Sequence, residues 1–192
     1  PLHAQLKQAG AHFRDVSGWE SPAWYGDAPK RETFGRPDWF HFWRDEHNAV
    51  RNSVGLFDMS FMSKFLVQGR DAGAFLNRLS TANVDKDMNT ITYTQWLNER
   101  GFMEADLTVT KLDVGKFLVI ATDTMHNHVL NHVQRRIRND FVTVTDVTGS
   151  YCQINVQGPQ SRELLQTVTS RDMSKFAFRQ ASEIDIDLAR VL

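Results

Sequence analysis

Apolar and polar positions alternate along the middle of the chain in a way that predicts β-strands. Residues 91–98 (ITYTQWLN) alternate with a period of two, and residues 102–112 do the same after a turn at 99–101. A second turn at 113–115 precedes KFLVIAT (116–122). We therefore expect three consecutive strands that form an antiparallel meander.

Apolar residues at helical spacing predict helices before and after this meander. The expected helices cover 2–9, 38–54, 72–80 with Asp71 as its cap, 124–139, and a segment that starts at Pro159. Short strands are expected at 55–60, 64–69, 141–148 and 151–158, and a loop at 18–37. We interpret the aromatic residues of the helix at 38–54 as core filling rather than as a stacking platform for a ligand. The pattern predicts an α+β fold in which helices pack on antiparallel sheets.

Composition excludes several classes of protein. The 192 residues carry 22 Lys and Arg against 23 Asp and Glu, so the net charge of −1 gives no basic patch for nucleic acid. No apolar run is long enough to cross a membrane, and the first residues show no secretion signal. Cys152 is the single cysteine, and its place in an alternating segment predicts a buried position. These features favour a cytoplasmic globular protein and leave homo-oligomer formation open.

The end of the chain suggests a piece of a longer protein. Residues 184–191 alternate apolar and polar side chains up to the last residue, and the first residue is Pro1. Domains usually close with a polar tail or a docked helix. We expect the fold to be truncated at its C-terminus.

The histidines of the helix at 124–139 raise the question of a metal site. His128 and His132 are four residues apart and share one face, whereas His126 points elsewhere. A site would need a third ligand, and no Glu lies between the two histidines as in HExxH. We therefore predict no metal, with these histidines on an exposed polar face.

A carboxylate among apolar residues marks the return strand of the hairpin. Asp106 lies between apolar positions, and Glu104, two residues earlier, is expected on the same face. A carboxylate in such a strand costs several kcal/mol unless it is paired, which makes Asp106 a candidate functional residue. The alternative is an Asp at a sheet edge that holds a turn or an arginine. The chain contains no GxSxG, GxGxxG or GxxxxGK[ST] motif.

Three segments in order resemble the tetrahydrofolate-binding T-protein of the glycine cleavage system. They are VGLFDMSFMSKFLVQGRDAGAFLNRLSTANVD, YTQWLNERGFMEADLTV and DVTGSYCQINVQGPQSRELLQ. The resemblance implies that Asp106 lies beside the pterin and N10 of folate and assists proton transfer during capture of the one-carbon unit. It also implies that Tyr93 stacks on the pterin ring, that Met59 lines the same cavity, and that Thr108 contributes to folate binding. T-proteins usually have two acidic residues where this chain has Ala105-Asp106.

A second and closer resemblance is to the C-terminal folate domain of FAD-dependent dimethylglycine and sarcosine dehydrogenases. It is carried by the opening segment 1–26 and by RETFGRPDWFHFWRDEHNAVRNSVGLFDMSFMSKFLV (31–67). It implies residues 1–36 as a lead-in from a missing flavin-binding half, and 37–192 as an incomplete folate domain. FAD would bind only in that missing half, which would oxidise a methylated amine. The folate domain would capture the carbon as 5,10-methylenetetrahydrofolate.

Two other functions stay open. The chain could be part of a stand-alone T-protein aminomethyltransferase, although the aromatic segment at 34–43 argues against this. It could also be a T-protein-like module that has lost catalysis and serves in regulation or assembly. Asp106 favours an enzyme, while the absence of a second acid beside it favours the module.

Overall fold

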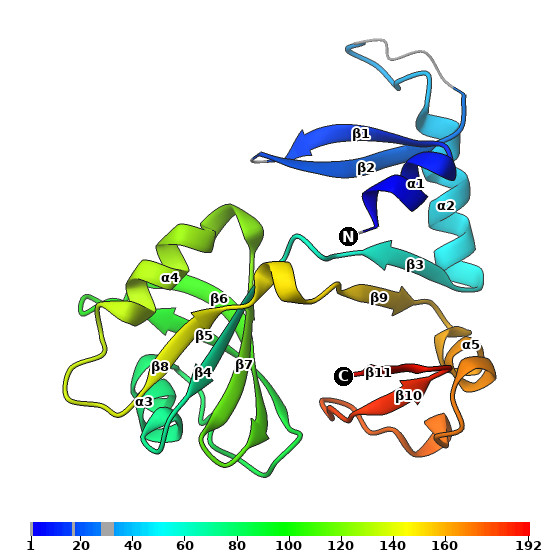
Figure 1. Ribbon diagram of the computed structural model, residues 1–192. Coiled ribbons are helices and arrows are strands. Elements are labelled where there is room, and N and C mark those ends of the chain that lie inside the picture. The colour runs from blue at the N-terminus through cyan, green and yellow to red at the C-terminus, as the bar shows by residue number, and fades with distance from the viewer. Residues whose placement is uncertain (1, 17, 28–32) are drawn as a thin grey trace. The chain divides into compact units, whose positions relative to one another are not determined.

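The computed structural model describes residues 2–16, 18–27 and 33–192. The chain divides into two compact units, each made from two stretches of sequence (Figure 1). The first unit comprises 1–60 and 152–173, and the second comprises 61–151 and 174–192. The predicted boundary after residue 36 stays a prediction, and part of that lead-in lies outside the described residues.

The described residues of the first unit form two antiparallel strand pairs and three helices. Its elements are α1 (His3–Gln8), β1 (Ala11–Val16), β2 (Trp19–Tyr25), α2 (Phe40–Asn52), β3 (Gly55–Asp58), β9 (Ile154–Gln157) and α5 (Ser161–Val168). Strand β1 pairs with β2 and β3 pairs with β9. The prediction of a loop from residue 18 onward is wrong over β2. Its proline, Pro22, lies at a register shift, where a strand tolerates the missing N–H.

Aromatic side chains hold the first unit together. Trp24 is 3% exposed and stacks on His12 and on Trp39, with ring centroids 4.8 and 5.0 Å apart. Trp43 meets Trp39 edge-on at 4.2 Å. Trp39 and Trp43 therefore pack beside the buried Trp24, but α2 itself has no buried residue, so the interpretation of its aromatic residues as core filling is only partly correct.

The second unit is built on a five-stranded antiparallel sheet with the strand order β5-β6-β7-β4-β8. The sheet strands are β4 (Ser63–Gln68), β5 (Ile91–Leu97), β6 (Met103–Asp113), β7 (Lys116–Ala121) and β8 (Thr143–Asp146). The remaining elements are α3 (Ala72–Leu79), η1 (Asp123–Met125), α4 (His126–Gln134), η2 (Thr148–Ser150), and the pair β10 (Ile184–Ile186) and β11 (Ala189–Val191). A further turn, η3 (Met173–Lys175), spans the boundary between the units. The predicted meander is confirmed as β5-β6-β7.

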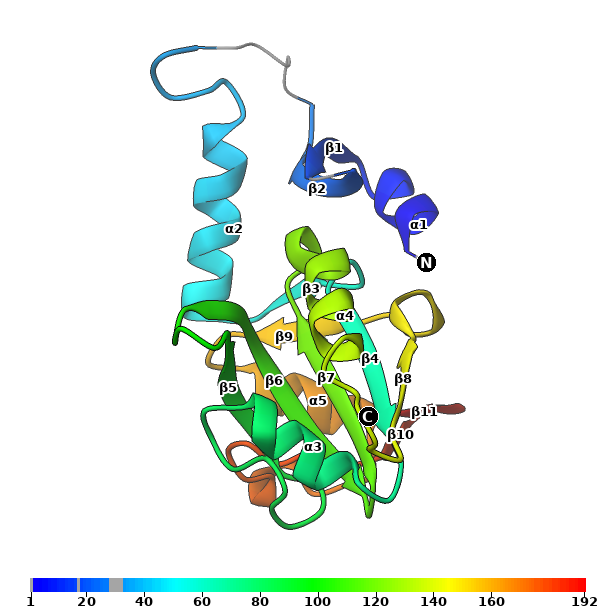
Figure 2. The same cartoon turned by 90° about the vertical axis from the view of Figure 1, so that its left-hand side faces the viewer.

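Helices α3 and α4 cover one face of this sheet and enclose its core (Figure 2). The largest fully buried side chains of the core are Trp96, Phe65, Phe75, Phe117 and Leu76. The predicted α+β fold with helices packed on antiparallel sheets is confirmed. Within the described ranges, no helix has the length and apolar character needed to span a membrane.

Two local predictions in this region are wrong. Helix α4 ends at Gln134 rather than at 139. Beyond that end, the Asp140 carboxylate accepts hydrogen bonds from the Arg78 side chain and from the Arg138 N–H, which holds the chain out of the helix. Cys152 is exposed rather than buried, because β9 begins only at Ile154 and Cys152 lies outside the strand pairing.

Candidate functional site

Three predicted site residues lie together on the face of β5 and β6 that points away from α3 and α4. The strand register pairs Tyr93 with Thr108 and Gln95 with Asp106. Side chains alternate between the two faces of a strand, and the intervening Thr94 and Leu107 are buried in the core. The structure thus brings Tyr93, Asp106 and Thr108 to one open face.

The Asp106 carboxylate is the polar centre of this face. The Gln95 side-chain amide donates a hydrogen bond to Asp106 Oδ1 at 3.0 Å. Hydrogen bonding of Tyr93 to Asp106 raises the pKa of the tyrosine hydroxyl, with smaller effects in the same direction from partial burial and from the Asp106 charge. Tyr93 is 51% exposed, so its ring is free to contact a flat ligand. Tyr93 and Asp106 together offer an aromatic surface next to a carboxylate that can accept a proton.

A shallow hollow of about 210 Å³ opens beside Asp106. It is lined by Met103, Glu104, Ala105, Asp106, Thr122, Met125 and Val129. Whole small molecules usually occupy sites of about 300–1,000 Å³. The hollow is therefore smaller than a whole-ligand site, and Met125 and Val129 place it on the helix-covered side of the sheet rather than on the face of Tyr93.

Met59, the fourth predicted site residue, belongs to the first unit. It follows β3 and is half-buried, and its backbone N–H donates to the Gln153 carbonyl at 2.8 Å. Its role in a ligand cavity stays a prediction.

Glu104 does not share the face of Asp106, which corrects the expectation from their spacing. The pairing of β5 with β6 shifts register after Trp96, which pairs with Ala105 while Leu97 pairs with Met103. Glu104 is thus the extra residue of a β-bulge, and a bulge redirects a side chain. Its Oε2 lies 2.7 Å from His128 Nε2 and 4.0 Å from His132 Nδ1, both on α4.

His132 is buried, so the predicted exposed polar helix face is wrong at this position. Its side chain is 4% exposed and stacks on Trp96 with ring centroids 5.9 Å apart. Burial is the main reason why the pKa of His132 is lowered.

The pKa of Glu104 is also lowered, mainly by the hydrogen bond that its carboxylate accepts from Asn98. The prediction of no metal depended on the lack of a third ligand near the two histidines, and β6 brings the Glu104 carboxylate to them as a candidate third ligand.

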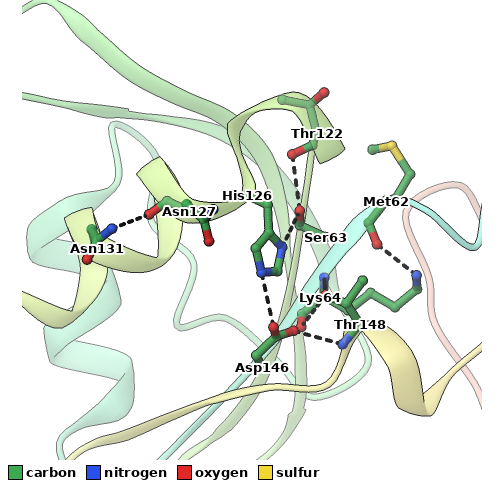
Figure 3. A network of polar contacts seen from close by, with 9 residues as sticks. All are labelled: Met62, Ser63, Lys64, Thr122, His126, Asn127, Asn131, Asp146 and Thr148. Atoms are coloured by element: carbon green, nitrogen blue, oxygen red, sulfur yellow. Dashed lines mark hydrogen bonds and ion pairs between the residues drawn. The ribbon is translucent and has the colours of Figure 1, made fainter. Parts of the chain in front are cut away.

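Figure 3 shows a second polar network, which joins β4, β8 and α4. Ser63 Oγ donates to the Thr122 carbonyl and lies 2.9 Å from His126 Nδ1, while His126 Nε2 lies 3.0 Å from Asp146 Oδ2. The residue types are those of a hydrolase triad, but Ser63 is completely buried and cannot reach a substrate. The network ties the elements of the sheet together.

Comparison with known proteins identifies the family. Residues 2–192 match the GCVT N-terminal domain, so the chain belongs to that family, the folate-binding domain of T-proteins. This confirms the resemblance found in the sequence. The solved structure of the glycine cleavage system aminomethyltransferase T from Bartonella henselae superimposes with a TM-score of 0.80 at 23% identity, covering 98% of this chain and 47% of that one.

Two curated relatives are larger enzymes. The chain is 36% identical to 4-methylaminobutanoate oxidase (formaldehyde-forming) from Paenarthrobacter nicotinovorans, over 98% of this chain and 23% of the relative. It is 32% identical to mitochondrial dimethylglycine dehydrogenase from Mus musculus, over 85% of this chain and 19% of the relative. The chain thus spans about a fifth of the length of these two relatives.

Proposed function

We propose that the chain binds tetrahydrofolate on the open face of β5 and β6 and transfers a one-carbon unit to it. The observation that carries this proposal is the gathering of Tyr93, Asp106 and Thr108 on one face, in a chain of the GCVT family. The exposed Tyr93 ring would stack on the pterin, and the Thr108 hydroxyl would form a hydrogen bond to the ligand. The part of Met59, which belongs to the first unit, stays a prediction from the family resemblance.

Asp106 is the proposed catalytic residue. Capture of an iminium carbon by tetrahydrofolate forms bonds from that carbon to N5 and N10, and breaks its bond to the amine nitrogen. Two protons leave N5 and N10, of which one ends on the released amine and the other goes to solvent. An exposed carboxylate held by Gln95 is suited to accept the N10 proton and to pass it on.

The carbon would come from a methylated amine that a flavin-dependent partner half oxidises. The relatives named as an oxidase and as a dehydrogenase of methylated amines support this source. FAD would supply the oxidation in that other half, since no GxGxxG sequence that could hold a dinucleotide occurs in this chain. The product would be 5,10-methylenetetrahydrofolate.

A T-protein aminomethyltransferase is the second candidate. The fold shared with aminomethyltransferase T favours it. In that case the same face would bind tetrahydrofolate, but the carbon would arrive as an aminomethyl group on a protein partner. The two candidates therefore share the folate site and differ in the donor.

Calorimetric titration of the chain with tetrahydrofolate tests the folate site that both candidates share. Saturable heat is expected with tetrahydrofolate, and none with p-aminobenzoylglutamate, which carries the anionic tail but lacks the pterin. Absence of heat at millimolar tetrahydrofolate would contradict the proposal. Equal binding of both ligands would show that the charged tail is recognised and that the Tyr93 face is not the pterin site.

A further inference from the structure

Two histidines of α4 and a glutamate of β6 converge on the helix-covered side of the sheet. One ligand atom from each of Glu104, His128 and His132 lies within 4.8 Å of the other two. The distances from Glu104 Oε2 are 2.7 Å to His128 Nε2 and 4.0 Å to His132 Nδ1. Ligand atoms around a tetrahedral zinc ion lie about 3.4 Å apart, since each is about 2.0–2.2 Å from the metal. The two distances from Glu104 Oε2 bracket this value, and the two histidine nitrogens lie within 4.8 Å of each other, so modest side-chain shifts would complete the geometry.

The buried imidazole of His132 is the strongest sign of a missing partner. Among the described residues it makes no hydrogen bond through either ring nitrogen: Nε2 is buried without a partner, and Nδ1 faces Glu104 at a distance too long for a hydrogen bond. Buried polar side chains almost always have a partner. A cation between Nδ1 and the Glu104 carboxylate would give Nδ1 a partner, while Nε2 would still lack one among the described residues.

The surroundings also hold these side chains in place. Asn98 Nδ2 donates to Glu104 Oε1 at 2.8 Å, which leaves Oε2 directed at the histidines. Trp96 stacks on the His132 ring and fixes its plane. Such outer contacts orient ligands in metal sites. His128 is 45% exposed and leaves a path from solvent.

We infer that Glu104, His128 and His132 bind a divalent first-row metal ion of the Zn²⁺ type. Two imidazole nitrogens and a carboxylate oxygen suit this class of ion, and three protein ligands leave a fourth position for water. The ion would join α4 to the bulge of β6, two residues from Asp106. The inference does not depend on folate binding, because none of the three residues contributes to the open face.

Zn²⁺ titration of the tag-free, chelator-stripped chain tests this inference without folate. We expect one ion per chain with micromolar or tighter affinity, a higher melting temperature with Zn²⁺, and the visible absorption of four-coordinate Co²⁺ when cobalt replaces zinc. His128→Asn and Glu104→Gln should each weaken Zn²⁺ binding by at least about 10-fold. His47→Asn, which changes an exposed histidine of α2, is the matched control and should bind like the unmodified chain.

Two results would overturn the inference. One is the absence of saturable Zn²⁺ binding. The other is binding that His128→Asn leaves unchanged, which would place the ion on other histidines. His128 is half-exposed, so its substitution should preserve the fold, and circular dichroism of the variant checks this point.

Discussion

Glu104 and Asp106 are two residues apart on β6, yet their carboxylates contact opposite faces of the sheet. Glu104 meets His128 of α4, whereas Asp106 accepts a hydrogen bond from Gln95 on the open face. The cause is the register shift next to Trp96, which makes Glu104 the unpaired residue of a bulge. One short segment therefore contributes to two proposed sites, and the Asp106 carboxylate lies on the open face.

Substitutions of Tyr93 should separate ring stacking from the hydroxyl group. Tyr93→Phe keeps the ring, and Gln95 still holds Asp106, so tetrahydrofolate affinity should stay within about threefold. Tyr93→Ala removes the stacking surface and should lower the affinity by about tenfold or more, or about 1.4 kcal/mol. Calorimetric Kd values for both variants provide the measurement.

The control for Tyr93→Ala is Tyr151→Ala, which removes another exposed tyrosine from outside the strands. It should leave the affinity unchanged. Equal losses in Tyr93→Phe and Tyr93→Ala would show that the hydroxyl binds the ligand and that the stacking role is wrong.

The meander was predictable because local rules agree there. Its strands alternate with a period of two, and both turns contain a glycine with positive φ, 81° at Gly101 and 66° at Gly115. The hairpin of β1 and β2 was missed because Pro22 and the neighbouring aromatic residues are typical of a loop. A proline at a register shift keeps strand pairing possible, and the sequence does not reveal where a shift occurs.

The open-face site was predictable for the same reason, whereas the histidine cluster was not. Asp106 stood out among apolar residues, Tyr93 and Thr108 were named by the family resemblance, and the alternation of a hairpin that the sequence indicates brings all three to one face. The cluster depends on a bulge that redirects Glu104 and on a contact between residues 24 positions apart. The spacing of His128 and His132 was a visible signal, but nothing local indicated which residue would face them.

Gly69 is a position where an added methyl group should damage the second unit. Its φ of 142° is rare for other residues, and a Cβ there would overlap the Phe141 carbonyl. Gly69→Ala should lower the free energy of unfolding by about 3 kcal/mol or more, since backbone strain and overpacking add. Chemical denaturation measures the loss. Gly149→Ala, where a Cβ meets open space, should change stability by less than about 0.5 kcal/mol, and equal effects would contradict the steric argument.

The network of Asp146 should make stability depend on pH in the acid range. Burial acts to raise the pKa of Asp146, but hydrogen bonds from Thr148 and the charge of His126 outweigh it, so the pKa is lowered. A carboxyl group with a lowered pKa in the folded state stabilises the fold above its unfolded pKa of about 3.9. That contribution is lost as the pH falls through the lower folded value.

Asp146→Asn removes this contribution and should cost about 1 kcal/mol at pH 7, a modest value because the carboxylate is 40% exposed. Unfolding of both proteins is measured from about pH 7 to about pH 2, which extends below the unfolded pKa. The difference between them should shrink at the acid end. A difference that stays constant with pH would show that the Asp146 charge contributes nothing.

Asp106→Asn should separate folate binding from chemistry. Asn keeps the size and an acceptor oxygen, so tetrahydrofolate affinity of the chain should change by less than about tenfold, or about 1.4 kcal/mol. The proton-accepting group is lost, which should slow one-carbon capture by about 10²–10⁴-fold.

The products of the longer flavin-dependent protein that the proposed function requires provide the measurement. There the Asp106→Asn variant should still oxidise amine but release formaldehyde instead of 5,10-methylenetetrahydrofolate. Asp113→Asn, at the exposed end of the same strand, is the control and should keep the original product. Undiminished 5,10-methylenetetrahydrofolate formation by Asp106→Asn would remove this carboxylate from the mechanism and favour a module without catalysis.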